Sequence, residues 1–398
     1  MKKIIKRTPI SVLVFTLMLI LLFPNFASAA SEIKEINYVT YAEKVITSLY
    51  ENKDLGANNA LGADITPNLS IYLEDKVKTN QYATKLNKTY KTNYKINITL
   101  LEEKTLIDKI FLKFNVQTYF NYVDLPNIDS GRGEVVEVII DSDNYKIIDI
   151  YNQNDYYDSF VRGESIDIIK ENSNIVALSK SDTIKKKQIE LKNTINKTYE
   201  EEMNSTLENP PPISRASSSL NKNAIASYAR NNYYKTNPAS GNGVVPYYDF
   251  SQISGNYDCT NFVSHALLAG GATVYDTGNS GISSTGWYYR NTSNRSSSWS
   301  GVVNLHNFLI GNITKGPWGV SNSYSTRIGD FANGDIIQFN NGSIWRHSTI
   351  VTGYYTMDDR QGALVTGRSA SGAYNNNEKA ADIYAGYAKR TISVFGNY

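Results

Sequence analysis

The chain has 398 residues, of which 41% are apolar, and a net charge of +2. This length and apolar content are sufficient for two or three globular domains with cores of their own. The nearly balanced charge argues against a nucleic-acid-binding protein, and the single cysteine excludes an internal disulfide.

The first 29 residues have the three regions of a secretory signal peptide. A basic start from Lys2 to Arg7 precedes an apolar run over 10–23, and small residues at 27–29 form a cleavage site. The apolar run is too short to span a bilayer comfortably, and no later segment is apolar enough. We therefore expect a secreted protein, extracellular or cell-wall associated, with no transmembrane segment in the mature chain; an uncleaved anchor is the alternative.

Residues 32–162 have the pattern of one α+β domain. Apolar residues at helical spacing predict helices over 39–50 and 69–77. Four antiparallel strands are then predicted, with a turn at 141–144 before the last, at 95–101, 110–116, 133–140 and 145–151. This order resembles the cone-shaped domains of the nuclear-transport-factor-like superfamily, which implies a sheet wrapped around a pocket. With no catalytic constellation in it, the segment is expected to be a binding or spacer module.

Residues 163–220 are predicted to link two domains. The part up to residue 207 is helical and strongly charged, which is typical of a solvated helix or a spacer. A proline run at 209–213 and a serine run at 217–219 then mark the domain boundary.

Residues 221–398 form the second predicted domain, also α+β. Helices are expected at 223–233 and 260–269. Asn341-Gly342 is a strong hairpin signal, and it lies between the first two of four predicted strands, at 335–339, 347–355, 362–367 and 388–395.

Cys259 lies where the second of these helices begins, directly after Asp258, a residue type that favours the N-cap. The helix dipole and the unpaired N–H groups of the first turn would lower the pKa of the thiol. A thiolate is the attacking species in acyl transfer, and the same N–H groups can hold an oxyanion. The alternative is an inert buried cysteine, which is the commoner state of a free thiol.

A base for this thiol must come from three histidines. His265 lies on the same helix, about 240° around the axis from Cys259, so it cannot easily reach the sulfur. His306 lies in an amphipathic helical segment and is expected to be a packing or surface residue. His347 begins a predicted strand, and a strand-borne histidine can face a helix-borne cysteine.

Three segments in this order resemble the family known as Putative amidase domain: 257–264 (YDCTNFVS), 334–339 (GDIIQF) and 347–351 (HSTIV). That family belongs to the papain-like superfamily, with the CHAP and NlpC-type cell-wall peptidases. The resemblance implies a nucleophile helix packed on an antiparallel sheet. It also implies that Cys259 is the nucleophile and His347 the general base, whereas Asp258 either caps the helix or recognises a peptide amine.

The sequence departs from the family pattern at two places. His265 stands where the family usually has Gln, and Arg368 stands where a polar third catalytic residue is usual. Thr366 or Ser369 would then have to orient the imidazole, although neither carries a negative charge.

Upstream of the nucleophile, Tyr248 or Gln252 is a candidate second donor to the oxyanion. The histidines are too far apart in sequence to suggest a zinc site, so we expect no metal and no cofactor.

These observations predict a secreted cysteine-dependent amidase or peptidase. Its expected substrate is a peptide, with peptidoglycan peptides as the leading candidate, and nucleic acid is not an expected partner. The alternative is a catalytically degenerate amidase-like domain that binds peptide or wall material.

Overall fold

The fold is that of a computed structural model, which describes residues 37–62, 64–152, 155–162, 182–204, 218–235, 258–324, 331–342, 344–357, 360–369, 373–383 and 385–398. The predicted signal peptide, the proline run, Tyr248 and Gln252 lie outside these ranges. None of the helices within them is both long and apolar enough to cross a membrane.

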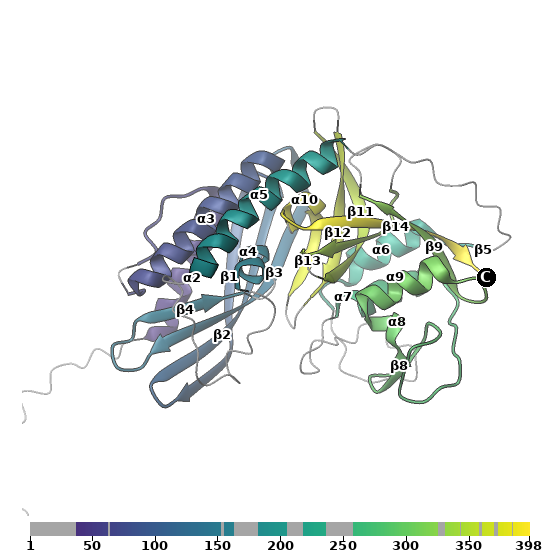
Figure 1. Cartoon of the computed structure of the whole chain (residues 1–398), viewed down its shortest axis with the longest axis horizontal. Coiled ribbons are helices and arrows are strands. Elements are labelled where there is room, and N and C mark those ends of the chain that lie inside the picture. Colours follow the sequence, from purple (N-terminus) through teal and green to yellow (C-terminus); the bar gives the residue numbers. More distant parts are fainter. Residues whose placement is uncertain are drawn as a thin grey trace, which may run out of the picture.

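The N-terminal half consists of two helices, α2 (Tyr38–Leu55) and α3 (Pro67–Asn87), packed on an antiparallel sheet (Figure 1). The sheet strands are β1 (Lys91–Leu106), β2 (Lys109–Tyr122), β3 (Leu125–Asp141) and β4 (Ile147–Tyr151). Alternate residues of β2, from Ile110 to Val116, are buried against the helices, as the period of two requires. The predicted helices and strands are confirmed here. Most of them extend further than predicted, whereas β4 begins two residues later than predicted.

A short helix, α4 (Tyr156–Arg162), and a long one, α5 (Asp182–Asn204), follow. The structure differs from the predicted solvated helix, because α5 buries a stripe of Ile184, Leu191 and Ile195. Its charged residues occupy the remaining faces, so composition alone hides the stripe. This helix is part of the core rather than an isolated spacer.

The C-terminal half places helices on one face of an antiparallel sheet. The helices on this face are α6 (Lys222–Asn232), α7 (Cys259–Ala269), α8 (Ser297–Ser300) and α9 (Val302–Gly311). The short helix α10 (Ala380–Ile383) belongs to the apolar cluster on the opposite face. The strands are β5 (Ser218–Ser219), β9 (Pro317–Ser323), β10 (Ile336–Asn340), β11 (Trp345–Met357), β12 (Arg360–Arg368), β13 (Tyr374–Lys379) and β14 (Ala388–Asn397). A separate small sheet contains β6 (Ile282–Ser283), β7 (Tyr289–Asn291) and β8 (Asn294–Ser296). The α+β class predicted from sequence is confirmed.

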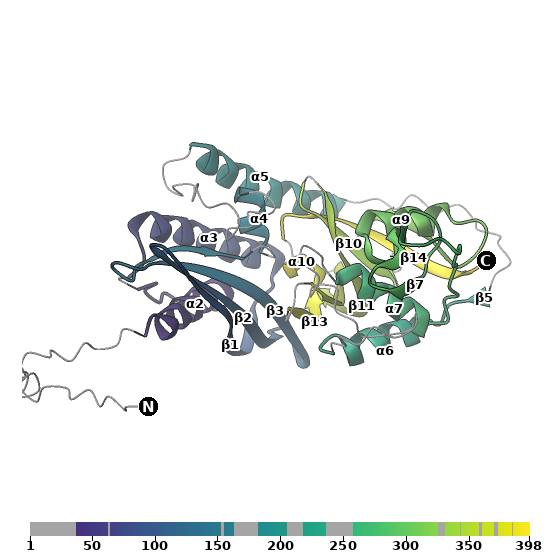
Figure 2. The ribbon, with the colours of Figure 1, turned by 90° about the horizontal axis from the view of Figure 1, so that it is seen from below.

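One continuous sheet joins the two halves. Its strand order is β1-β2-β3-β13-β12-β11-β10-β14-β5, and β13 meets β3 where Asn376 pairs with Gly131. The approach is close at Gly133, where a Cβ atom would lie 2.5 Å from the Tyr374 nitrogen. Figures 1 and 2 show the halves side by side along this sheet.

A buried cluster of charges crosses the same junction. Arg132 of β3 donates to Glu378 at 2.7 Å through Nε and lies 3.1 Å from Asp382. Lys91 of β1 also pairs with Asp382, at 3.1 Å, and with Asp54 at 2.8 Å. Since each buried charge has a partner from another element, the cluster fixes the junction.

We expect Arg132→Met to destabilise the protein strongly. The substitution keeps most of the side-chain volume but leaves Glu378 and Asp382 buried without their main cation, which costs about 3–5 kcal/mol. Urea unfolding of the full chain measures this loss. Arg290→Met, which breaks the exposed pair with Asp276, is the matched control and should change stability little; equal effects of the two substitutions would contradict this view of the junction.

Candidate active site

Helix α7 places Cys259 at its first residue. The helix is anchored by an apolar stripe that includes Phe262, Val263 and Ala266, all fully buried. These residues share one cluster with Ile336 of β10 and Ile350 of β11. The helix that begins at Cys259 is therefore packed on an antiparallel sheet, as the sequence predicted.

The thiol of Cys259 lies against the backbone of β11. Its Sγ is 3.9 Å from the carbonyl oxygen of Arg346 and accepts a hydrogen bond from the Ser348 N–H. Strands β11 and β12 are paired as far as Ile350 and Thr366 and separate beyond this pair. The sulfur lies beside the separated part of β11, and we call this place the split in the sheet. Its two backbone partners flank His347 on either side.

His347 approaches this split from the other face of the sheet. It pairs with Phe339, and the two rings lie 6.0 Å apart, whereas the neighbouring Ser348 points toward α7 and lies 3.2 Å from the Thr260 hydroxyl. A Cβ atom on Gly367 of β12 would lie 3.5 Å from the imidazole Nε2. The ring therefore leans toward β12, the side on which the thiol lies.

Among the described residues, the hydrogen-bond partners of the thiol are the side-chain hydroxyl of Thr260, at 3.7 Å, the Arg346 carbonyl and the Ser348 N–H. The imidazole is not among them. A direct contact between the Cys259 thiol and the His347 imidazole therefore stays a prediction, since the imidazole and helix α7 lie on opposite faces of β11.

The predicted lowering of the thiol pKa is not observed. Burial raises the pKa of Cys259 above its usual value, and the nearby Asp258 carboxylate adds to this, while hydrogen bonds from Ser348 and Thr260 oppose it. Desolvation disfavours the charged form more than these hydrogen bonds favour it. The resting site therefore holds a neutral thiol.

The imidazole is neutral too. Burial, with a smaller contribution from Arg346, lowers the pKa of His347 to about 3. A neutral imidazole can accept a proton, as a general base must. The resting arrangement is a thiol beside an uncharged base rather than a preformed ion pair.

Asp258 lies at the N-cap position, as predicted, but its side chain makes no capping hydrogen bond to the helix. The prediction that this side chain caps the helix is therefore wrong. The carboxylate forms a buried ion pair with Arg368 of β12 and accepts a hydrogen bond from Asn261 Nδ2 at 2.8 Å. Arg368 also donates to the Lys235 carbonyl and stacks over the Phe262 ring. The unusual Arg368 noted in the sequence is thus the ion-pair partner of Asp258, the residue before Cys259.

The two candidate orienting residues differ in position. Thr366 is buried, and its hydroxyl bonds with the Thr352 hydroxyl at 2.9 Å and the Asn377 N–H at 3.2 Å, so it is directed to β13. Ser369 is held at the start of α7, because its carbonyl accepts the Asp258 N–H at 3.1 Å. Ser369 is therefore the better placed of the two.

The other histidines lie apart from the split. His265 is buried against the rings of Trp299, at 5.2 Å, and Tyr289, and burial lowers its pKa to about 3. His306 is half-buried on α9 and bonds with Asn307. Within the described ranges, no three His, Cys, Asp or Glu side chains gather as a metal site would need.

Sequence reasoning missed the polar chain behind the thiol. Ser348 bonds with Thr260 and with Gln338 Nε2 at 3.0 Å, and Gln338 in turn accepts from Arg390 Nε at 2.9 Å. Successive side chains of a strand point to opposite faces of the sheet, so the alternation along β11 could have predicted that Ser348 and His347 lie on different faces.

Residues 219–395 match the model of the family described as "Putative amidase domain". No curated protein sequence and no solved structure matches the chain. This match supports, at a coarse level, an amidase-type hydrolase that acts on amide bonds.

We expect Gly367→Ala to impair amide hydrolysis without unfolding the protein. The new methyl group would lie 3.0 Å from Thr349 Cγ2 and 3.5 Å from the His347 imidazole, and a displaced catalytic group can cost about 100-fold in rate. Turnover and thermal unfolding of the variant measure the two effects. Gly311→Ala, which meets no atom within 4 Å, is the control; equal turnover in both variants would contradict the placement of the imidazole.

Stability should fall in mild acid because two buried histidines are neutral only in the folded state. Their pKa values rise from about 3 to the ordinary 6.5 on unfolding, so the unfolded chain binds more protons between these values. The free energy of unfolding then decreases by about 1.4 kcal/mol per pH unit for each ring as the pH falls from 6.5.

His265→Gln removes one of these contributions. Urea unfolding between pH 6 and pH 4 should show a shallower pH dependence than in the wild type, by about 1.4 kcal/mol per unit. His306→Gln, with its partly exposed ring, should change the slope much less. Parallel curves for the wild type and His265→Gln would show that the buried ring is not neutral.

Proposed function

We propose that the C-terminal half is a cysteine amidase of the papain-like type, with Cys259 as nucleophile and His347 as general base. The position of the sulfur carries the proposal: it is held at a helix start, between the Arg346 carbonyl and the Ser348 N–H, beside the backbone of His347. The neutral state of the imidazole supports its role as a proton acceptor.

The proposed reaction begins with transfer of the thiol proton to His347 as the sulfur attacks the amide carbonyl carbon. The Cys259 backbone N–H, at the open end of α7, would hold the resulting oxyanion. The imidazolium then protonates the leaving amine, which leaves a thioester. Finally His347 removes a proton from water, the hydroxide adds to the thioester, and the thiol and a carboxylic acid are released.

In this mechanism proton transfer accompanies attack, because burial opposes a standing thiolate. Ser369 is the proposed orienting residue, from its position beside Asp258. The ion pair of Asp258 with Arg368 occupies its carboxylate, which favours a positioning role over recognition of a substrate amine.

The proposed location is outside the cell membrane, and the proposed substrate is a peptide of the cell wall. The support is the signal-like sequence at 1–29 and the mild basic excess after residue 217, which would draw the domain weakly to an anionic wall.

Product analysis after incubation with purified cell wall tests the proposal. Wild-type protein should release new amine and carboxylate ends, Cys259→Ala should release none, and His347→Ala should act about 100- to 10,000-fold more slowly. His306→Ala is the matched histidine control and should act like the wild type.

Activity that survives in Cys259→Ala would refute the cysteine mechanism. If wild type and Cys259→Ala both bind cell wall and neither shows turnover, the result would instead support a degenerate binding module. The burial of the thiol is the observation that favours this second candidate.

A further inference from the structure

A groove of about 730 Å³ lies where the N-terminal sheet meets the amidase half. Its floor is formed by β1, β2 and β3, on the sheet face turned away from α2 and α3, and its other wall by the end of α6 and by β13. The volume falls within the range of about 300–1,000 Å³ that is typical of ligand sites.

The lining of this groove has an unusual chemistry. Among its described residues none is aliphatic, and aromatic rings supply the extended apolar surface while side-chain amides supply much of the polar surface. The rings are Tyr119, Phe120, Tyr233, Tyr234 and Tyr374, and the amides are Asn93, Asn97, Gln117, Asn121 and Asn376.

The rings come from both halves of the chain. Tyr119 of β2 is 45% exposed and Tyr234, just after α6, is 57% exposed. Tyr233 lies between them, in edge contact with Tyr234 at 5.3 Å. Tyr119, Tyr233 and Tyr234 all line the groove, so tyrosines from both halves of the chain contribute to its surface.

The charge of the groove is nearly balanced. Lys95 and Asp129 contribute opposite charges, and the guanidinium of Arg132 is already paired with Glu378 and Asp382. A strongly anionic or cationic ligand would find no matching excess here. The lack of aliphatic side chains likewise offers no pocket of the kind that holds a lipid chain or an aliphatic peptide side chain.

We propose that this groove binds a neutral polysaccharide chain. A sugar ring has an apolar face that suits stacking on exposed tyrosines, and its hydroxyls both donate and accept hydrogen bonds. Side-chain amides and tyrosine hydroxyls also both donate and accept hydrogen bonds. The lining can therefore hydrogen-bond with uncharged sugar units and stack against them.

One end of the groove lies beside the active site. Tyr374 pairs with Arg368 in the sheet, and the Lys235 carbonyl next to Tyr234 accepts a hydrogen bond from the same arginine. Arg368 holds Asp258, which precedes the nucleophile. A bound chain would thus place its substituents close to the start of α7, although binding itself does not depend on Cys259.

Calorimetric titration of the full chain carrying Cys259→Ala tests the proposal without turnover. The probes are the β-1,4-linked hexasaccharides of glucose and of N-acetylglucosamine, and at least one should bind saturably. Replacing both Tyr119 and Tyr234 with Ala should weaken binding by about tenfold or more. Asn97→Ala, which removes one exposed amide from the floor, should weaken it less.

Tyr82→Ala is the matched control, because this tyrosine is 40% exposed on α3, behind the sheet. It should leave hexasaccharide binding unchanged, and thermal unfolding verifies that each variant is folded. No saturable binding of either sugar, or equal affinity in the double variant and the control, would overturn the proposal. Competition by an uncharged Gly-Ser hexapeptide as strong as by the sugar would also overturn it and assign the groove to peptide.

Discussion

The position of Cys259 depends on one buried ion pair, between Arg368 at the end of β12 and Asp258 at the start of α7. Both side chains are almost fully buried, so neither charge can lose its partner without a large free-energy cost. The pair therefore fixes the start of helix α7 to strand β12. Cys259 follows Asp258 directly, and its sulfur is held against β11 by this docking rather than by a helix cap.

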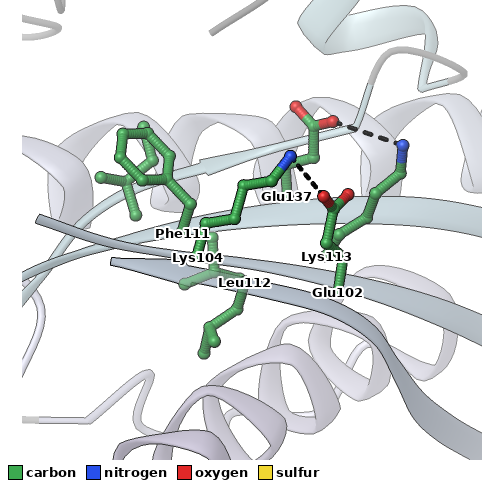
Figure 3. Close-up of a pocket in the computed structure, with 8 residues that line it drawn as sticks. Glu102, Lys104, Phe111, Leu112, Lys113 and Glu137 are labelled. Atoms are coloured by element: carbon green, nitrogen blue, oxygen red, sulfur yellow. Dashed lines mark ion pairs between the residues drawn. The ribbon is translucent and has the colours of Figure 1, made fainter. Parts of the chain in front are cut away.

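The junction of the two halves is likewise held by buried charges that need their partners. Charged side chains at the β3–β13 contact are buried and mutually paired, and the backbone approaches closely at Gly133. The small pocket between the ion pairs of β1, β2 and β3 in Figure 3 is different, since it holds only about 10 Å³, room for one water at most. The tyrosine-lined groove gains its volume because it lies between the halves.

Period and spacing predicted much of the fold. The alternation in β2, the hairpin at Asn341-Gly342 and the start of α7 at Cys259 each depend on local sequence. β13 could not be predicted in this way, because its run of Asn, Glu and Lys is stabilised by distant partners on β3. The pairing of Cys259 with His347 stays a prediction. The protonation state of the thiol could not be predicted from sequence, since burial outweighs the effect of the helix terminus and only the tertiary fold determines burial.

The shared sheet has a consequence for how this chain can be divided. The segment 219–395 that matches the amidase family contributes Ile337, Phe339, Val351 and Val365 to the same apolar cluster as α2, α3 and α5. Expressed by itself, this segment would present those residues to water and would tend to self-associate. The N-terminal half thus completes the core of the segment 219–395 by covering these apolar side chains.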